Sequence, residues 1–209
     1  MARSPTCGSS AACDLARDML AKGVMTLMRS ADLVEAPAWS IRPEMPIDLD
    51  QIHELHRSAF RGAAEAELVD AVRASGGFVP DLSLVAVADD GSVLGHIMVS
   101  QVVFDPDGPG PRGEVLALAP LAVLQPHWNR GIGSALTTAA LSVADLRDEP
   151  FVAVLGAPSF YGRFGFSPAA DADVRSPYDA AGPAYQVRRL GDHEVEPGTV
   201  VYPPVFREL

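Results

Sequence analysis

Two short segments of the sequence carry residues whose types and spacing suit anion binding and proton transfer. The first is Asn129-Arg-Gly-Ile-Gly-Ser134, between an apolar run that ends at Val123 and a helix-forming segment over 131–147. The first turn of a helix leaves backbone N–H groups unpaired, and the helix dipole favours an anion there. The two glycines of the segment lack Cβ atoms, so a pyrophosphate can come close to the backbone. The order of strand, glycine loop and helix therefore predicts a phosphate site.

The second segment is Pro158-Ser-Phe-Tyr-Gly-Arg-Phe-Gly-Phe-Ser-Pro-Ala169, which follows a strand-like run over 151–155. It contains Tyr161, whose phenol is protonated at neutral pH and can donate to a developing anion. Neither segment is specific alone, because glycine pairs are common where a loop enters a helix. The first segment also lacks the third glycine of the dinucleotide fingerprint and the Gly-Lys-Ser/Thr of the P-loop.

Together, the two segments resemble motifs of the GNAT superfamily of acetyl-CoA-dependent N-acetyltransferases. The stretch Tyr161-Gly-Arg-Phe-Gly-Phe166 is similar to the Tyr-x-Arg-Phe-Gly-Phe ending of a bacterial subgroup, with Phe160 in place of a preceding tyrosine. The glycine loop corresponds to the family's Gln/Arg-x-x-Gly-x-Gly/Ala motif, except that Trp128 occupies the Gln/Arg position. The resemblance covers roughly residues 41–206 and depends on both motifs in this order.

The resemblance implies that acetyl-CoA is the co-substrate and that no metal takes part. It places the acyl and pantetheine parts along the backbone of 121–123 and the pyrophosphate in the glycine loop. Trp128 removes a side-chain contact to phosphate but leaves the backbone contacts. The expected cofactor-binding residues are Leu121, Ala122, Val123, Asn129, Arg130, Gly131, Ile132, Gly133, Ser134 and Ala135.

The resemblance also assigns Tyr161 as the proton donor to the leaving thiolate. Many relatives carry a Glu or His general base on the strand before the loop. Counting back from Leu121 at period two, those positions are Ala117 and Ala119, and neither can accept a proton. His96 on the preceding strand is the remaining catalytic candidate, acting directly or through water. A water chain, or binding of the amine in its neutral form, explains the chemistry as well.

The composition limits the classes of partner. The chain has 209 residues and a net charge of −11, which argues against nucleic acid or an anionic membrane as its main partner. An acidic surface suits an amine, so a small-molecule amine or a peptide amine is the expected acceptor. The apolar runs are too short for a transmembrane helix, and the two cysteines, Cys7 and Cys13, imply neither a disulfide framework nor a metal site. A cytoplasmic monomer or homodimer is expected.

The resemblance implies a mixed α/β fold with a mostly antiparallel twisted sheet flanked by helices, and the periodicity of the sequence places helices and strands in it. Residues 1–37 are expected to be an N-terminal extension, poorly ordered or a docking helix over 11–29, and residues 38–209 the N-acetyltransferase domain. The predicted helices cover 48–60, 63–75, 131–147 and 159–164. The predicted strands cover 39–42, 82–88, 92–104, 114–123, 151–155, 184–188 and 199–202.

The sequence leaves two other functions open. A non-catalytic acyl-CoA-binding or regulatory module would keep the cofactor loop, and Trp128 and the missing strand carboxylate favour it slightly. A nucleotide-binding protein is disfavoured by the missing lysine and third glycine. Amine-dependent release of free CoA separates an enzyme from a binding module.

Overall fold

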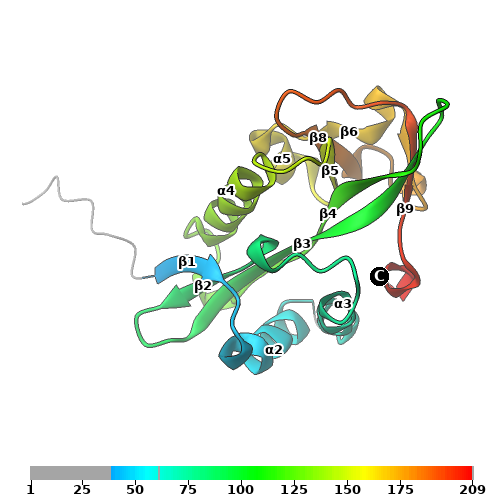
Figure 1. Cartoon of the computed structure of the whole chain (residues 1–209). Coiled ribbons are helices and arrows are strands. Elements are labelled where there is room, and N and C mark those ends of the chain that lie inside the picture. The colour runs from blue at the N-terminus through cyan, green and yellow to red at the C-terminus, as the bar shows by residue number, and fades with distance from the viewer. Residues whose placement is uncertain (1–38, 61, 209) are drawn as a thin grey trace, which may run out of the picture. The chain divides into compact units, whose positions relative to one another are not determined.

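A twisted, mostly antiparallel sheet organises the domain, and Figure 1 shows helices on both of its faces. The computed structural model describes residues 39–60 and 62–208. The main strands, in their order across the sheet, are β1 (Trp39–Pro43), β2 (Ser83–Ala88), β3 (Val93–Pro106), β4 (Gly113–Val123), β5 (Phe151–Leu155), β8 (Tyr185–Arg189) and β6 (Ser167–Pro168). Neighbours pair antiparallel except β4 and β5, which are parallel. This confirms the predicted fold class.

Two further strands extend the far end of β3. β9 (Gly198–Val201) pairs antiparallel with β3 and parallel with β7 (Val174–Arg175). The strands predicted from the sequence are all present within a few residues of their expected bounds. The two-residue strands β6 and β7 were not predicted, because so short a segment has no period to detect.

The helices form a layer on each face of the sheet. α2 (Leu49–Phe60) and α3 (Ala64–Arg73) cover one face, and α4 (Ile132–Ala144) lies on the other (Figure 1). α5 (Pro158–Tyr161) follows β5 and continues as a 3-10 turn, Gly162–Phe164. Other 3-10 turns are Pro46–Asp48, Pro80–Leu82, Gln125–His127, Ala169–Ala172, Asp179–Ala184 and Pro204–Glu208.

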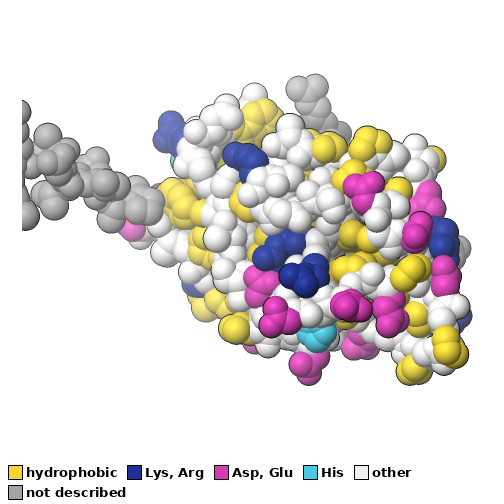
Figure 2. All heavy atoms as spheres, turned by 90° about the horizontal axis from the view of Figure 1, so that it is seen from above, with side chains coloured by type: hydrophobic (Ala, Val, Ile, Leu, Met, Phe, Trp, Pro, Cys, Tyr) yellow, Lys and Arg dark blue, Asp and Glu magenta, His cyan; other side chains and the backbone are white. Residues whose placement is uncertain are grey.

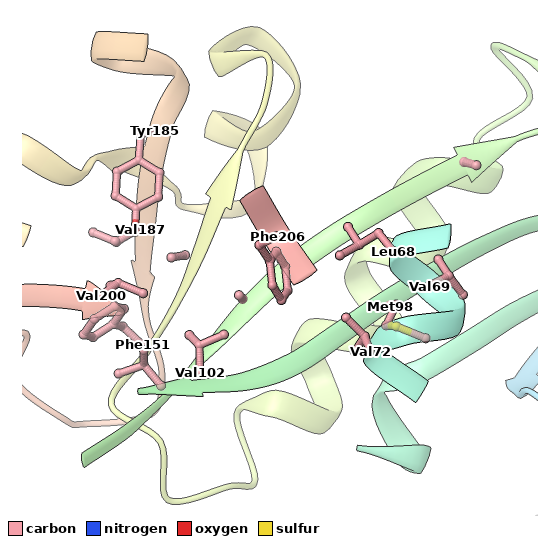
Figure 3. Close-up of a cluster of buried hydrophobic side chains, with 14 of the residues drawn as sticks. Leu68, Val69, Val72, Met98, Val102, Phe151, Tyr185, Val187, Val200 and Phe206 are labelled. Carbon is pink, nitrogen blue, oxygen red and sulfur yellow. The ribbon is translucent and has the colours of Figure 1, made fainter. Parts of the chain in front are cut away.

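Each face of the sheet has its own buried core. On the face of α3, Leu68 and Val72 pack with Met98 of β3 and with Phe206 near the C-terminus (Figure 3). On the face of α4, the buried residues include Leu136, Ala140, Ile97, Leu116 and Val152. The alternation of side chains along β3 and β4 supplies both cores at once, which is why both strands read as nearly continuous apolar runs.

The sheet opens between β4 and β5. Their parallel pairing is limited to 116–118 against 152–154, whereas β4 continues to Val123. Beyond the paired residues no ladder joins the two strands, so a gap forms on the side of the sheet where both strands end. Ligands of α/β folds bind outside the carboxyl ends of parallel strands in gaps of this kind.

A β-bulge in β4 overturns one prediction about this gap. From the pair Ile97–Leu121 to the pair Val99–Leu118, β3 advances by two residues and β4 by three. The extra residue reverses the alternation of side chains. Leu121 therefore packs with the core under α4, whereas Ala117 and Ala119 pack with the core under α2 and α3. The expectation that these alanines share a face with Leu121 is wrong.

Phe60 at the end of α2 belongs to neither core. It is 41% exposed at the last residue of α2, whereas Ile52 and Leu55 of the same helix are buried. The prediction of an N-terminal extension, with a helix over 11–29, concerns residues that lie outside the described part of the chain.

Deleting residues 1–36 should leave a folded domain that still binds CoA. All five residues of β1 pair with β2, and β1 begins only at Trp39, so the deletion keeps every strand of the sheet. Circular dichroism, thermal unfolding and calorimetric titration with CoA would check this. An insoluble or molten product would contradict it.

Candidate active site

A cavity of about 620 Å³ opens where β4 and β5 separate. Its walls come from the end of β4, the loop before α4, the first turn of α4, the end of α2 and the segment after β5. Of the residues predicted to bind the cofactor, Arg130 is exposed and Ala135 half-buried, and neither lines the cavity. The others do line it: Leu121, Ala122, Val123, Asn129, Gly131, Ile132, Gly133 and Ser134.

The glycine loop presents the start of α4 to the cavity. Asn129 and Gly131 have positive φ values of 60° and 83°, which the sharp entry into the helix requires. The first intrahelical bond runs from the Ala135 N–H to the Gly131 carbonyl at 2.9 Å, so the amides before Ala135 have no partner in the helix. These amides and the helix dipole make this wall of the cavity suited to an anion.

Two further side chains of the cavity are Arg163 and Trp128. Arg163 lies 4.8 Å from the ring of Phe160, and both residues line the cavity. Trp128, at the position where the motif usually has Gln or Arg, lines the cavity half-exposed and donates its indole N–H to the Val123 carbonyl at 2.7 Å. The net charge of the chain is −11, yet no Asp or Glu is among the described residues that line the cavity. The site is therefore locally suited to a polyanion.

Tyr161 is buried and does not line the cavity itself, but it packs against Phe160, which does. Its ring packs edge-on against Phe160 and Phe166, at centroid distances of 4.9 and 5.5 Å, and a Cβ at Gly156 would collide with it. Burial raises the pKa of the Tyr161 phenol to about 12, which keeps the hydroxyl protonated. No group in the described part of the chain hydrogen-bonds this hydroxyl.

His96 of β3 is fully buried and contacts His56 of α2, whereas Tyr161 belongs to the core under α4. His96 does not line the cavity. Its Nδ1 is 2.9 Å from His56 Nε2, and its Nε2 is 2.9 Å from Ser83 Oγ and 3.3 Å from Glu44 Oε2. Arg73 donates two hydrogen bonds, of 2.7 and 3.0 Å, to the Glu44 carboxylate. We call these five residues the buried histidine network. Of these residues only His96 was predicted as catalytic from the sequence, because its partners lie 13 to 52 residues away in the chain.

The buried histidine network holds one carboxylate and two neutral imidazoles. Burial opposes ionisation of Glu44, but hydrogen bonds from His96, Arg73 and Ser83 outweigh it and lower the pKa to about 2. Burial, and then the electrostatic interactions with His96, Arg73 and His53, which disfavour a positive charge on the ring, lower the pKa of His56 to about 2. Burial also lowers the pKa of His96, against the opposing effect of Glu44.

The neutral state of His56 should make the protein sensitive to acid. The unfolded chain protonates His56 as the pH falls through about 6.5, whereas the folded protein does so only near 2. The unfolded state binds more protons between these values, so the free energy of unfolding should fall as the pH falls, by at most about 1.4 kcal/mol per pH unit for this one group. Urea unfolding from pH 7.5 to 4.5 would measure the slope.

The matched variants for this measurement are His56→Gln and His193→Gln. His193 is exposed, so its loss should leave the slope unchanged, whereas His56→Gln should flatten it. Equal slopes for wild type and His56→Gln would contradict the assignment.

The fold, the parted strands and the anion-binding helix start together define the class of protein. Residues 49–166 match the model of the acetyltransferase (GNAT) family, and the chain belongs to this family. The match includes both parts of the sequence that carried the resemblance.

Relatives of known sequence or structure support the same assignment. The chain is 37% identical over 152 residues to the uncharacterized N-acetyltransferase YhbS of Escherichia coli K12, a match that covers 73% of this chain and 87% of YhbS. The crystal structure of E. coli YhbS in complex with CoA superposes with a TM-score of 0.73 at 34% identity, over 82% of this chain and 93% of that one. A GNAT acetyltransferase from Brucella melitensis in complex with acetyl-CoA gives a TM-score of 0.65 at 30% identity, over 80% and 97% of the two chains.

Two other kinds of site were considered in the described part of the chain. No group of three or more His, Cys, Asp or Glu residues there is arranged to hold a metal ion. His53 and His56, three residues apart on α2, bind instead to Asp70 and His96. No helix among the described residues is both long and apolar enough to cross a membrane.

Proposed function

We propose that the protein transfers an acetyl group from acetyl-CoA to a primary amine by direct attack within a ternary complex. The observation that carries this proposal is the cavity at the parting of β4 and β5, which is free of carboxylates, contains a helix start, and has a protonated tyrosine behind one wall. The E. coli and B. melitensis relatives with CoA and acetyl-CoA bound support the choice of co-substrate.

The residues of the cavity fit the parts of this co-substrate. The pyrophosphate would bind the amides at the start of α4, where Gly133 leaves room beside Val123 and Phe160. Arg163 would supply the positive charge that the cavity needs for a polyanion. The pantetheine would lie along 121–123, with Trp128 closing the loop over the end of β4.

The chemistry then needs two proton movements. The amine attacks the thioester carbonyl, whose oxygen becomes an oxyanion and requires a hydrogen-bond donor. The carbon–sulfur bond breaks as the carbonyl re-forms, and we assign to Tyr161 the protonation of the departing thiolate. The amine loses a proton on attack. Ala117 and Ala119 cannot accept it, and His96 is the base candidate that the sequence offers.

The acceptor class follows from charge. Figure 2 shows acidic side chains gathered toward one part of the surface, several of them beside arginines. With a net charge of −11, such a surface favours a cationic amine over an anionic acceptor. We propose a small-molecule amine or a peptide amine on this basis.

A thiol-release assay would test the proposal. Purified protein is incubated with acetyl-CoA and a panel of polyamines, amino acids, aminoglycosides and peptides, and free CoA is measured with a thiol reagent. Amine-dependent CoA release is expected for at least one class. CoA binding by calorimetry without amine-dependent release across the panel would instead support a non-catalytic acyl-CoA-binding module.

A further inference from the structure

One buried nitrogen of the site has no partner. His56 on α2 is 0% exposed, and its Nδ1 has no hydrogen-bond partner among the described residues. The ring stacks on Phe60, with centroids 6.0 Å apart and planes 8° from parallel, and Phe60 lines the cavity. Buried polar atoms are nearly always paired, so an unpaired one beside a ligand cavity points to a partner that arrives with the ligand.

The buried histidine network fixes which tautomer His56 adopts. Ser83 Oγ donates to the ionised Glu44 at 2.7 Å, so its lone pairs face His96 Nε2, which must carry a hydrogen. His96 is neutral, so its Nδ1 is an acceptor and takes the hydrogen bond from His56 Nε2–H. His56 is also neutral, so its Nδ1 has no hydrogen and presents a free lone pair.

We propose that His56 Nδ1 is the entry point of a proton relay, His56–His96–Glu44, which removes the proton of the attacking amine through water at the Phe60 side of the cavity. This inference rests on the proposed acetyl transfer. It differs from the sequence expectation for His96, because His96 is one step away from the cavity and His56 is the residue next to its lining.

Each bond in the relay has a donor and an acceptor in line. After attack, the N–H bond of the amine breaks through the water, and an N–H bond forms at His56 Nδ1. His56 then gives its Nε2 proton to His96 Nδ1, and His96 gives its Nε2 proton to Glu44, directly or through Ser83. One proton has moved from the amine to the carboxylate, and both imidazoles remain neutral with their tautomers exchanged. No oxidant or further reactant is needed.

The charges around His56 favour passage of the proton through the ring over its retention there. His56 is faced by Arg73 from α3, by His96 from β3 and by His53 on its own helix, all of which oppose a resting positive charge. Glu44 and Asp48 raise the pKa of His96, which favours passage of the proton in that direction, and Glu44 does not keep the proton because its own pKa is about 2. Glu44 is 7% exposed, so the proton can leave to solvent there.

The test is His56→Gln in the full-length protein, with His193→Gln as the control. The amide nitrogen of glutamine can keep the hydrogen bond to His96 Nδ1, but glutamine has no basic nitrogen. Affinity for CoA should be unchanged, and kcat with a responsive amine should fall about tenfold or more at pH 7, with a deficit that narrows as the pH rises. His193 is exposed and does not face His56, so its variant should keep the wild-type rate and pH profile.

Nitrogen-15 NMR of the histidine rings tests the relay without relying on a folded variant. His56 Nδ1 and His96 Nδ1 should be unprotonated, and both Nε2 atoms protonated, at pH 7. A proton on His56 Nδ1, or wild-type kcat and pH profile in His56→Gln, would overturn the relay. If the wild-type protein shows no amine-dependent turnover, the proposed function itself is overturned, and the role of His56 with it. If the wild type is active and His56→Gln is equally active, only the relay is overturned.

Discussion

The substitution Gly133→Asp should reduce CoA affinity by about 10²-fold or more. Gly133 is the second residue of α4 and lines the cavity, and a Cβ there would lie 3.7 Å from Val123 and 3.8 Å from Phe160, in ordinary contact. A carboxylate at this point would face the pyrophosphate, and two like charges about 4 Å apart near a protein surface repel by on the order of 4 kcal/mol. Isothermal titration calorimetry with CoA measures the loss.

The fold should tolerate this change, because an acidic residue in the first turn stabilises a helix by about 0.3–1 kcal/mol. Gly133→Asn has the same size without the charge, so it should lose much less affinity and isolates the electrostatic part. Gly108→Asp adds the same charge in the loop between β3 and β4, where nothing crowds the new Cβ, and should bind CoA as the wild type does. Wild-type affinity of Gly133→Asp for CoA would contradict binding of the pyrophosphate at the start of α4. Gly131→Asp should also bind CoA poorly, but its φ of 83° adds backbone strain, which makes it the less direct test.

Tyr161→Phe should lower kcat by roughly 10²-fold, within the usual range for loss of a general acid. The phenol has its pKa raised to about 12 by burial and is not bonded to a described protein group, so its proton can go to the thiolate. Phenylalanine keeps the ring that packs on Phe160, Phe166 and the backbone of Gly156. Thermal stability and CoA affinity should therefore change little.

The measurement needs a responsive amine and saturating acetyl-CoA over a range of pH. Tyr178→Phe is the matched control, because its hydroxyl already donates to the Phe206 carbonyl at 2.6 Å and is not free to reach a thiolate. That variant should lose some stability and keep its kcat. A Tyr161→Phe enzyme with wild-type kcat and an unchanged basic limb would leave Tyr161 as a packing residue only.

The anion site is the part of the molecule that the sequence determined most fully. The strand ending at Val123, the left-handed glycine at 131 and the helix after it are local features, and local periodicity and glycine conformation are readable from neighbouring residues. For the same reason eight of the ten predicted cofactor residues line one cavity: Leu121, Ala122, Val123, Asn129, Gly131, Ile132, Gly133 and Ser134. Their binding of acetyl-CoA remains a prediction.

The tertiary structure alone decided the arrangement of side chains around His96. A single extra residue in β4 turned Ala117 and Ala119 away from the face of Leu121, and only the pairing with β3 reveals that bulge. Glu44 and His56 meet His96 although they are 52 and 40 residues from it in the chain. Local patterns carry no record of such contacts, because burial beside a distant carboxylate, and not residue type, sets the proton positions and pKa values of a histidine.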